Sequence, residues 1–272
     1  CLTMTDDHEL DILITEIFDY HGYDFSGYSR ASFKRRIDRI YQLDGFGSFE
    51  EFLSRVRFDR GYFERLVEEI TVNVTEMFRD PSFYKVLREE ILPALRSKPF
   101  IRIWHAGCST GQEVYSMAIL LEEAGLLSKA LLYATDINQS VLETAKQGVF
   151  PLSLMKDYAE NYRDSGGKKD FTTYYFANYG LAKFDERLSQ KMVFSQHSLV
   201  SDGSFNEFDL IVCRNVMIYF DKELQDRALQ LFDDSLSRLG YLALGTKETI
   251  KYTSVQKKYE QLRNEKIWKK IN

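Results

Sequence analysis

The sequence predicts an α/β protein with a mostly parallel, Rossmann-like sheet, preceded by a small all-helical domain. The main observation is a strand at 100–104, followed by a turn that holds Gly107 and Gly111 and by a helix at 114–123. This order is typical of the first unit of a nucleotide-binding α/β fold, in which glycine lets the backbone approach a ligand closely. The Gly-x-x-x-Gly spacing alone is weak, because any tight turn between a strand and a helix can carry it.

A second apolar strand at 130–135 strengthens the prediction, because it ends at Asp136. An acidic side chain there can accept hydrogen bonds from both hydroxyls of a ribose. Alternatively, Asp136 only caps the helix expected at 138–147. The turn lacks both Gly-x-Gly-x-x-Gly and a following Lys-Ser/Thr, so a nucleoside ligand without a phosphate chain is favoured. S-adenosylmethionine (SAM) is such a ligand.

Residues 1–72 predict a domain of four helices. Apolar residues recur at helical spacing up to about His21, and again over 29–43 and 61–70, while Ser48 and Glu51 predict a capping box at the start of the third helix. The second helix carries the only dense basic cluster of the chain: Arg30, Lys34, Arg35, Arg36 and Arg39. Such a face is either simply solvated or an electrostatic dock for an acidic partner.

Residues 73–98 are expected to be a linker and a helix that leads into the α/β domain. Pro81 suits the first turn of that helix, with Asp80 as its cap. Hydrogen-bonding groups on Asn73, Thr75 and Arg79 make the segment either a plain connector or a strap across the ligand pocket.

Residues 99–272 complete the predicted α/β domain, with a small β subdomain inserted at about 150–190. The expected elements are strands at 191–195, 208–213 and 240–244, a long helix at 221–238 and a closing hairpin. Ligands of open α/β sheets bind at the carboxyl ends of the strands. Residues 107–113, Asp136, 198–199 and 214–219 lie at such ends and should converge on one pocket.

Composition narrows the function. A net charge of −5 argues against a general nucleic-acid binder, and no apolar run approaches the ~20 residues of a membrane span. The first residues lack the features of a signal peptide, and three cysteines form no framework of disulfides. The four histidines show no metal-ligand spacing. We expect a cytoplasmic monomer that binds neither a metal nor nucleic acid and does not insert into a membrane.

Four segments together resemble the chemotaxis receptor methyltransferases of the CheR type: 73–80 (Asn-Val-Thr-Glu-Met-Phe-Arg-Asp), 106–116, 134–137 and 213–220 (Cys-Arg-Asn-Val-Met-Ile-Tyr-Phe). The resemblance covers the chain from about residue 8 to 270. It implies a helical domain followed by a SAM-dependent methyltransferase domain that carries a small β subdomain.

The resemblance also implies the site. Cofactor contacts are expected from Asn73, Thr75, Arg79, Glu113, Asp136, Leu199 and Asn215, joined by Gly107, Ser198 and Val216 from the same strand ends. Arg79 and Tyr219 are expected to face the substrate glutamate and to act in catalysis. The chain departs from the family pattern at Ser198, where Asn is frequent, and at 245–248, where Gly-Thr-Lys-Glu replaces Gly-His-Ser-Glu.

The implied reaction is methyl transfer from SAM to a glutamate oxygen on a cytoplasmic helix of a chemotaxis receptor, leaving S-adenosylhomocysteine (SAH). In some members of the family the β subdomain holds a tether peptide at the receptor's C-terminus. The basic helix would then dock the glutamate-bearing receptor helices. The alternative is a SAM- or SAH-binding signalling module of the same fold without turnover.

Overall fold

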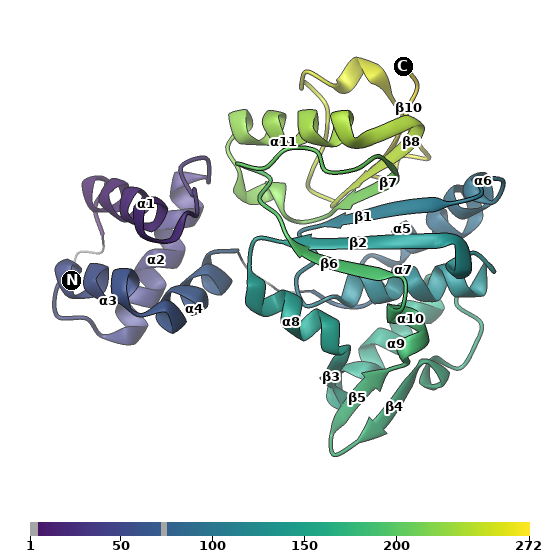
Figure 1. Cartoon of the computed structure of the whole chain (residues 1–272), viewed down its shortest axis with the longest axis horizontal. Coiled ribbons are helices and arrows are strands. Elements are labelled where there is room, and N and C mark those ends of the chain that lie inside the picture. The colour runs from purple at the N-terminus through teal and green to yellow at the C-terminus, as the bar shows by residue number, and fades with distance from the viewer. Residues whose placement is uncertain (1–4, 72–74) are drawn as a thin grey trace.

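The computed structural model describes residues 5–71 and 75–272. Figure 1 shows a helical domain on one side, a large twisted sheet with helices on both faces, and a small antiparallel sheet below it. None of the helices in these two ranges combines the length and apolar character needed to cross a membrane.

Four helices make the helical domain: α1 (Asp7–His21), α2 (Arg30–Asp44), α3 (Phe49–Phe58) and α4 (Arg60–Thr71). The α1 helix begins with a reciprocal capping box between Asp6 and Glu9 and ends at left-handed Gly22. At α3 the predicted capping box is only half formed. Ser48 accepts a hydrogen bond from the Glu51 amide, but the Glu51 carboxylate accepts one from Gly47 N instead of returning to Ser48.

The large sheet has seven strands in the order β6-β2-β1-β7-β8-β10-β9. Their bounds are β1 (Ile101–Ala106), β2 (Ala130–Asp136), β6 (Met192–Gln196), β7 (Phe208–Cys213), β8 (Leu236–Leu244), β9 (Tyr259–Gln261) and β10 (Ile267–Lys270). The first five strands in this order are parallel to one another. The strand β10 is antiparallel to both of its neighbours, β8 and β9. The predicted mostly parallel sheet and closing hairpin are therefore confirmed.

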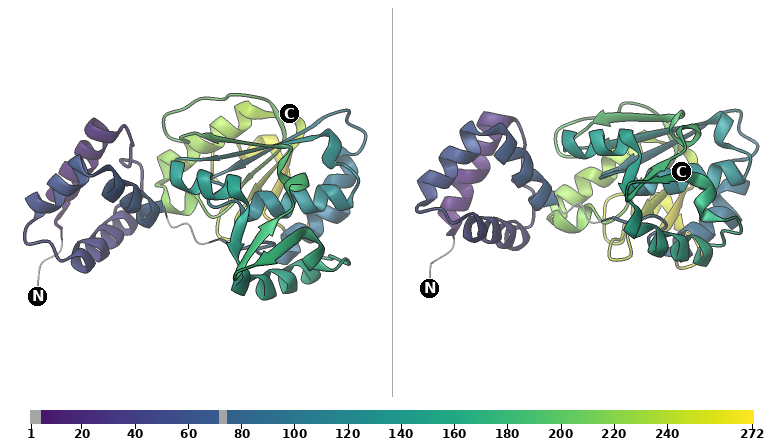
Figure 2. Two further views of the ribbon diagram at one scale, coloured as in Figure 1. Left: turned by 60° about the horizontal axis from the view of Figure 1, so that its bottom comes forward. Right: turned by 90° about the horizontal axis from the view of Figure 1, so that it is seen from below.

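Side chains of successive strand residues enter two separate apolar cores. Ile103 joins the core under α5 (Pro81–Val86), α6 (Leu92–Leu95) and α7 (Gln112–Glu123), whereas Trp104 joins the core shared by α11 (Lys222–Ser235) and the helical domain. The alternation of a strand explains this division. Figure 2 shows the sheet from two further sides, with the helical domain lying beside the main body in both views.

The small sheet has the order β3-β5-β4 and is antiparallel. The strands of this sheet are β3 (Val149–Pro151), β4 (Tyr175–Asn178) and β5 (Leu181–Phe184). Together with the helices α9 (Met155–Asp164) and α10 (Glu186–Ser189) they form the inserted subdomain, which follows α8 (Gln139–Gln147). The hydroxyls of Tyr162 and Tyr174 both donate to the Glu123 carboxylate, which also pairs with Arg88. This cluster fastens the subdomain to the end of α7.

One predicted helix end is wrong, and one predicted cap lacks its side-chain hydrogen bond. The helix expected at 221–238 ends at Ser235, because Leu236 already pairs with Phe208 in the sheet. Asp80 precedes the first turn of α5 but makes no capping hydrogen bond with its side chain. Its carboxylate pairs instead with Arg214, at 2.6 Å from Nη2.

Backbone contacts join the helical domain to the loop that follows β7. Ser29 N donates to Tyr219 O at 2.7 Å, and Asp221 N donates to Gly27 O at 2.9 Å. A Cβ on Gly27 would lie 2.7 Å from Leu224 Cδ2 and 3.0 Å from Leu224 Cβ, so a larger residue there would crowd α11. The helical domain therefore contacts the segment that carries the predicted catalytic tyrosine.

Candidate active site

A cavity opens at the carboxyl ends of β1, β2 and β7, on both sides of the point where the strand order reverses. It holds about 940 Å³ of empty space, part of which is open to solvent. Every predicted cofactor or catalytic residue in the described ranges lines it: Thr75, Arg79, Gly107, Glu113, Asp136, Ser198, Leu199, Asn215, Val216 and Tyr219. Asn73 lies outside those ranges.

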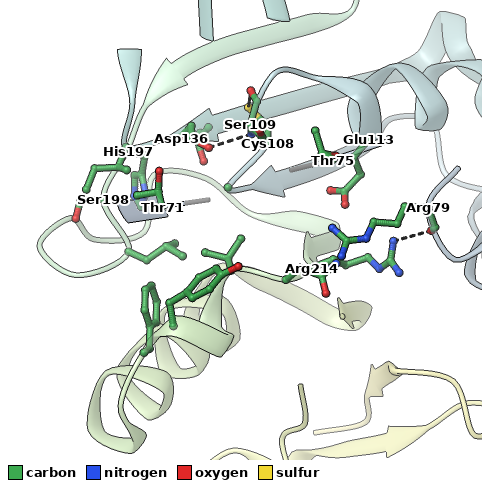
Figure 3. A pocket seen from close by; sticks show the side chains of 18 of the residues that line it. Thr71, Thr75, Arg79, Cys108, Ser109, Glu113, Asp136, His197, Ser198 and Arg214 are labelled. Atoms are coloured by element: carbon green, nitrogen blue, oxygen red, sulfur yellow. Dashed lines mark hydrogen bonds between the residues drawn. The ribbon is translucent and has the colours of Figure 1, made fainter. Parts of the chain in front are cut away.

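The polar groups form two sets at opposite ends of the cavity (Figure 3). Asp136, His197 and Ser198 lie at one end. Glu113, Arg79 and Arg214 lie at the other. An elongated ligand with a hydroxyl-rich group at one end and charged groups at the other suits this division.

The glycine turn brings the backbone against the cavity. Gly107 has a φ of 72°, and a Cβ on it would lie 2.4 Å from Val216 Cγ2. Gly111 has a φ of 99°, and its Cβ would lie 2.9 Å from Ala145 Cβ. Both positions therefore need glycine for conformation and for space.

Asp136 is buried at the end of β2, and its carboxylate faces the cavity. Oδ2 accepts from Ser109 N at 2.9 Å, and Oδ1 accepts from Asn138 N at 3.0 Å. The cap of α8 is Asn138, which accepts from Ser140 N. Burial raises the pKa of Asp136, although backbone hydrogen bonds oppose the rise. Each carboxylate oxygen keeps a lone pair for a further donor, as ribose hydroxyls are.

Glu113 lies in the first turn of α7, and a buried histidine of β1 holds its side chain in place. His105 Nδ1 lies 2.9 Å from Glu113 Oε1. Because an ionised carboxylate only accepts, Nδ1 is the donor of this hydrogen bond. The pair holds the Glu113 side chain at the end of the cavity opposite Asp136.

The segment from Thr75 to Asp80 forms one wall. Phe78 and Asp80 are both left-handed, with φ of 53° and 57°, a conformation that non-glycine residues adopt only when their surroundings hold them. Phe78 N donates to Ser116 Oγ at 3.0 Å. Arg214, with a side chain 2 % exposed, donates to Arg79 O and pairs with Asp80. Arg214 thereby ties this wall to the loop after β7.

That loop, residues 214–220, forms the adjoining part of the cavity wall. Tyr219 ends its short 3₁₀ turn and lines the cavity. The Arg36 guanidinium carbon lies 5.4 Å from the centre of the Tyr219 ring, a cation–π distance. The basic helix α2 therefore reaches the residue that borders the cavity.

The basic cluster on α2 is less positive than its sequence suggests. Arg30 pairs with Asp11 at 2.7 Å, Lys34 with Asp38 at 2.8 Å and Arg39 with Glu69 at 3.3 Å. Arg35 is exposed, and no carboxylate of the described residues pairs with it.

Sequence reasoning missed several residues of the cavity wall. Tyr28 reaches it from the helical domain, and Ile137 and His197 reach it from the α/β domain. Arg214 lies in the segment 214–219 that was expected at the cavity, but no role of its own was predicted for it. The only available signal was their position beside predicted residues, as with His197 next to Ser198. The histidines form no metal site in the described ranges, where no cluster of potential ligands occurs. His197 and His105 nonetheless serve the cavity and its wall.

The cavity fits a nucleoside. Ser109 Oγ and His197 Nδ1 are buried at its surface without a hydrogen-bond partner among the described residues. Buried polar atoms are normally paired, and a polar ligand in the cavity would supply partners for both. Together with the Asp136 carboxylate they offer donors and acceptors of the kind that a ribose and a base require.

Comparison with known proteins gives concordant results. The family described as "CheR methyltransferase, SAM binding domain" matches residues 73–267, and "CheR methyltransferase, all-alpha domain" matches residues 8–71. The "Putative methyltransferase Cher3" of Pseudomonas putida is 47% identical over 256 residues, which cover 94% of each chain. A "Chemotaxis protein methyltransferase" of Listeria innocua is 33% identical over 231 residues, covering 84% of this chain and 85% of that protein.

Solved structures show a weaker likeness. The plantazolicin methyltransferase BpumL in complex with SAH is 14% identical, with a TM-score of 0.39. The match covers 70% of this chain and 55% of that one.

Proposed function

The chain belongs to the CheR methyltransferase family, and we propose that it methylates glutamate side chains of chemotaxis receptors. The observation that carries the substrate assignment is the contact between α2 and the cavity wall. A basic helix reaches Tyr219 through Arg36, so an acidic receptor helix docked on α2 would lie at the mouth of the SAM site.

The SAM-binding domain of this family corresponds to residues 73–267. In our proposal, the Asp136 carboxylate accepts hydrogen bonds from the ribose hydroxyls, and Ser198 and Leu199 border the adenine. Glu113, Thr75 and Arg79 hold the methionine portion at the other end of the cavity. Gly107, Asn215 and Val216 complete the walls between the two ends. Asn73, which lies outside the described residues, would contribute from the start of the linker.

Bound SAM supplies an electrophilic methyl group: the carbon–oxygen bond to the acceptor forms as the carbon–sulfur bond breaks, and sulfur keeps the electron pair. A glutamate carboxylate is already ionised at neutral pH, so the residues need not remove a proton. Burial raises the pKa of the Cys108 thiol at the cavity wall, so that thiol is neither a base nor a competing nucleophile.

The chain's own contribution is alignment and exclusion of water. Arg79 orients the acceptor carboxylate from one wall. It must do so loosely, because a tight ion pair would reduce the nucleophilicity of that carboxylate. Tyr219, on the 214–220 loop, donates a hydrogen bond to the carboxylate or packs beside the methyl group. Its backbone is fixed by the hydrogen bond from Ser29 N.

The test is transfer of labelled methyl from SAM to purified cytoplasmic fragments of candidate receptors, with and without their C-terminal tails. We expect the label on the receptor and its release as methanol in alkali, which is the behaviour of a methyl ester. SAH binding without labelling of any receptor from the source organism would favour the alternative, a binding module without turnover. Dependence on the tail would indicate tethering through the β subdomain.

A further inference from the structure

Glu248 is a buried carboxylate outside the cavity wall. It lies in the turn after β8 and is 5% exposed. Burial raises the pKa of this carboxyl group, while backbone hydrogen bonds oppose the rise. Keeping such a group buried has a cost in stability, so the contacts that it makes are informative.

The Glu248 carboxylate accepts hydrogen bonds from backbone amides. Oε1 accepts from Asn215 N and Gly245 N, both at 2.7 Å, and Oε2 accepts from Ile218 N at 3.2 Å. Two of these three donors belong to the loop that forms one wall of the cavity. One carboxylate therefore holds that loop at both ends of its tight turn.

The loop needs such support. Asn215 has a φ of 63°, a left-handed conformation that asparagine adopts more readily than most other residues but that still costs energy relative to glycine. Gly245 packs directly against it, since a Cβ on Gly245 would lie 2.6 Å from Asn215 Oδ1 and 2.8 Å from Asn215 N. The Gly245–Glu248 turn and the cavity loop therefore fit together as one unit.

We infer that Glu248 is a positioning residue, which acts through the 215–219 loop to place Asn215 for the cofactor and Tyr219 for the methyl acceptor. This role rests on the SAM site of the proposed function but not on which acceptor is methylated. It also accounts for the departure at 246–247: Thr246 and Lys247 are both exposed, and the buried contact is made by Glu248.

The test is Glu248→Gln, which keeps the shape of the side chain but replaces one acceptor oxygen with an amide group that can only donate. We expect the SAH affinity, measured by calorimetry, to fall by about 10-fold. We also expect kcat at saturating SAM to fall, which weaker SAM binding alone would not cause. Both measurements are made well below the unfolding temperature, so that they report the folded protein.

Glu123→Gln is the matched control. Glu123 is also a largely buried carboxylate that accepts several hydrogen bonds. It lies far from the cavity, because it is ten residues beyond Glu113 on α7, roughly 15 Å along the helix. The Glu123→Gln variant should have a lower thermal stability and an unchanged SAH affinity. Gly245→Ala provides a second route to the same loop, because the added Cβ would crowd both Asn215 and Glu248 Oε1 while the carboxylate keeps its chemical identity.

Wild-type SAH affinity and kcat in folded Glu248→Gln would overturn the inference. If that variant does not fold, wild-type values in Gly245→Ala would overturn it instead. Failure of the proposed function is distinguishable, because the wild-type protein would then bind SAH without methylating a receptor.

Discussion

The ribose contact of Asp136 can be tested by replacing the side chain with alanine. The wild-type carboxylate accepts one backbone hydrogen bond on each oxygen and is expected to accept one ribose hydroxyl on each as well. A hydrogen bond to a charged group contributes about 1.5–3 kcal/mol, but burial of Asp136 offsets part of that gain. We therefore expect Asp136→Ala to weaken SAH binding by roughly 1–3 kcal/mol, or about 5- to 150-fold.

Calorimetric titration with SAH measures this loss, and Asp209→Ala is its control. Asp209 is a buried aspartate at the opposite end of the sheet, where it accepts from Arg102 N at 2.9 Å and pairs with Lys98. Its removal should lower stability and leave SAH affinity unchanged. Equal affinity in wild type and Asp136→Ala would refute the placement of the ribose at Asp136.

The pH dependence gives an independent check on the same carboxylate. Its pKa is raised above the ordinary 3.8, and ribose hydroxyls bind its ionised form. SAH affinity should therefore be level above the raised pKa and fall as the pH drops through it. In Asp136→Ala this particular fall should be absent, because the titrating group has been removed.

The remaining predictions concern chemistry, docking, the domain junction and stability. Tyr219→Phe should lower kcat while SAH affinity stays near wild type, and an equal loss of both would make Tyr219 a cofactor residue. Reversing Arg35 and Arg39 to Glu should raise the receptor KM and flatten its dependence on salt in initial-rate assays, since exposed charges are screened beyond ~10 Å. Parallel curves would make the cluster a solvated face. Tyr28→Phe removes only a hydroxyl from the cavity wall and should weaken SAH binding in calorimetry if the helical domain completes the site. Burial raises the pKa of Asp233, but hydrogen bonds from Lys258 and Tyr259 and the charge of Lys270 bring it below its usual range. Its stabilisation is thus complete above about pH 4 and lost as the pH falls through the lower folded value, so Asp233→Asn should flatten the acid limb of Tm against pH.

Local sequence patterns were sufficient for the elements that bear the cavity. The glycine turn is recognisable because Gly107 and Gly111 occupy conformations and spaces that exclude a side chain. Asp136 is recognisable because it ends an apolar strand. The end of α11 was misjudged, because Leu236 has the same apolar character in a helix or a strand and is decided by its pairing with Phe208.

Contacts between distant segments were beyond the reach of local patterns. Asp80 stands at the N-cap position of α5, but its carboxylate pairs with the buried Arg214 instead of capping the helix. The basic face of α2 loses charge to Asp11 on α1 and Glu69 on α4, which only the packing of the helices brings near. Tyr28 also requires the domain junction before it can reach the cavity.

The most direct test of the central claim is peptide mapping by mass spectrometry of a receptor cytoplasmic fragment after incubation with the protein and SAM. We predict methyl groups on the side-chain oxygens of glutamates along one helical face, and their loss when those glutamates are replaced by alanine. The reaction should also slow when the Asp136→Ala variant is used at a SAM concentration below the Kd of that variant. Methyl groups on nitrogen or on another residue type, or an unmodified receptor despite SAH binding, would contradict the assignment.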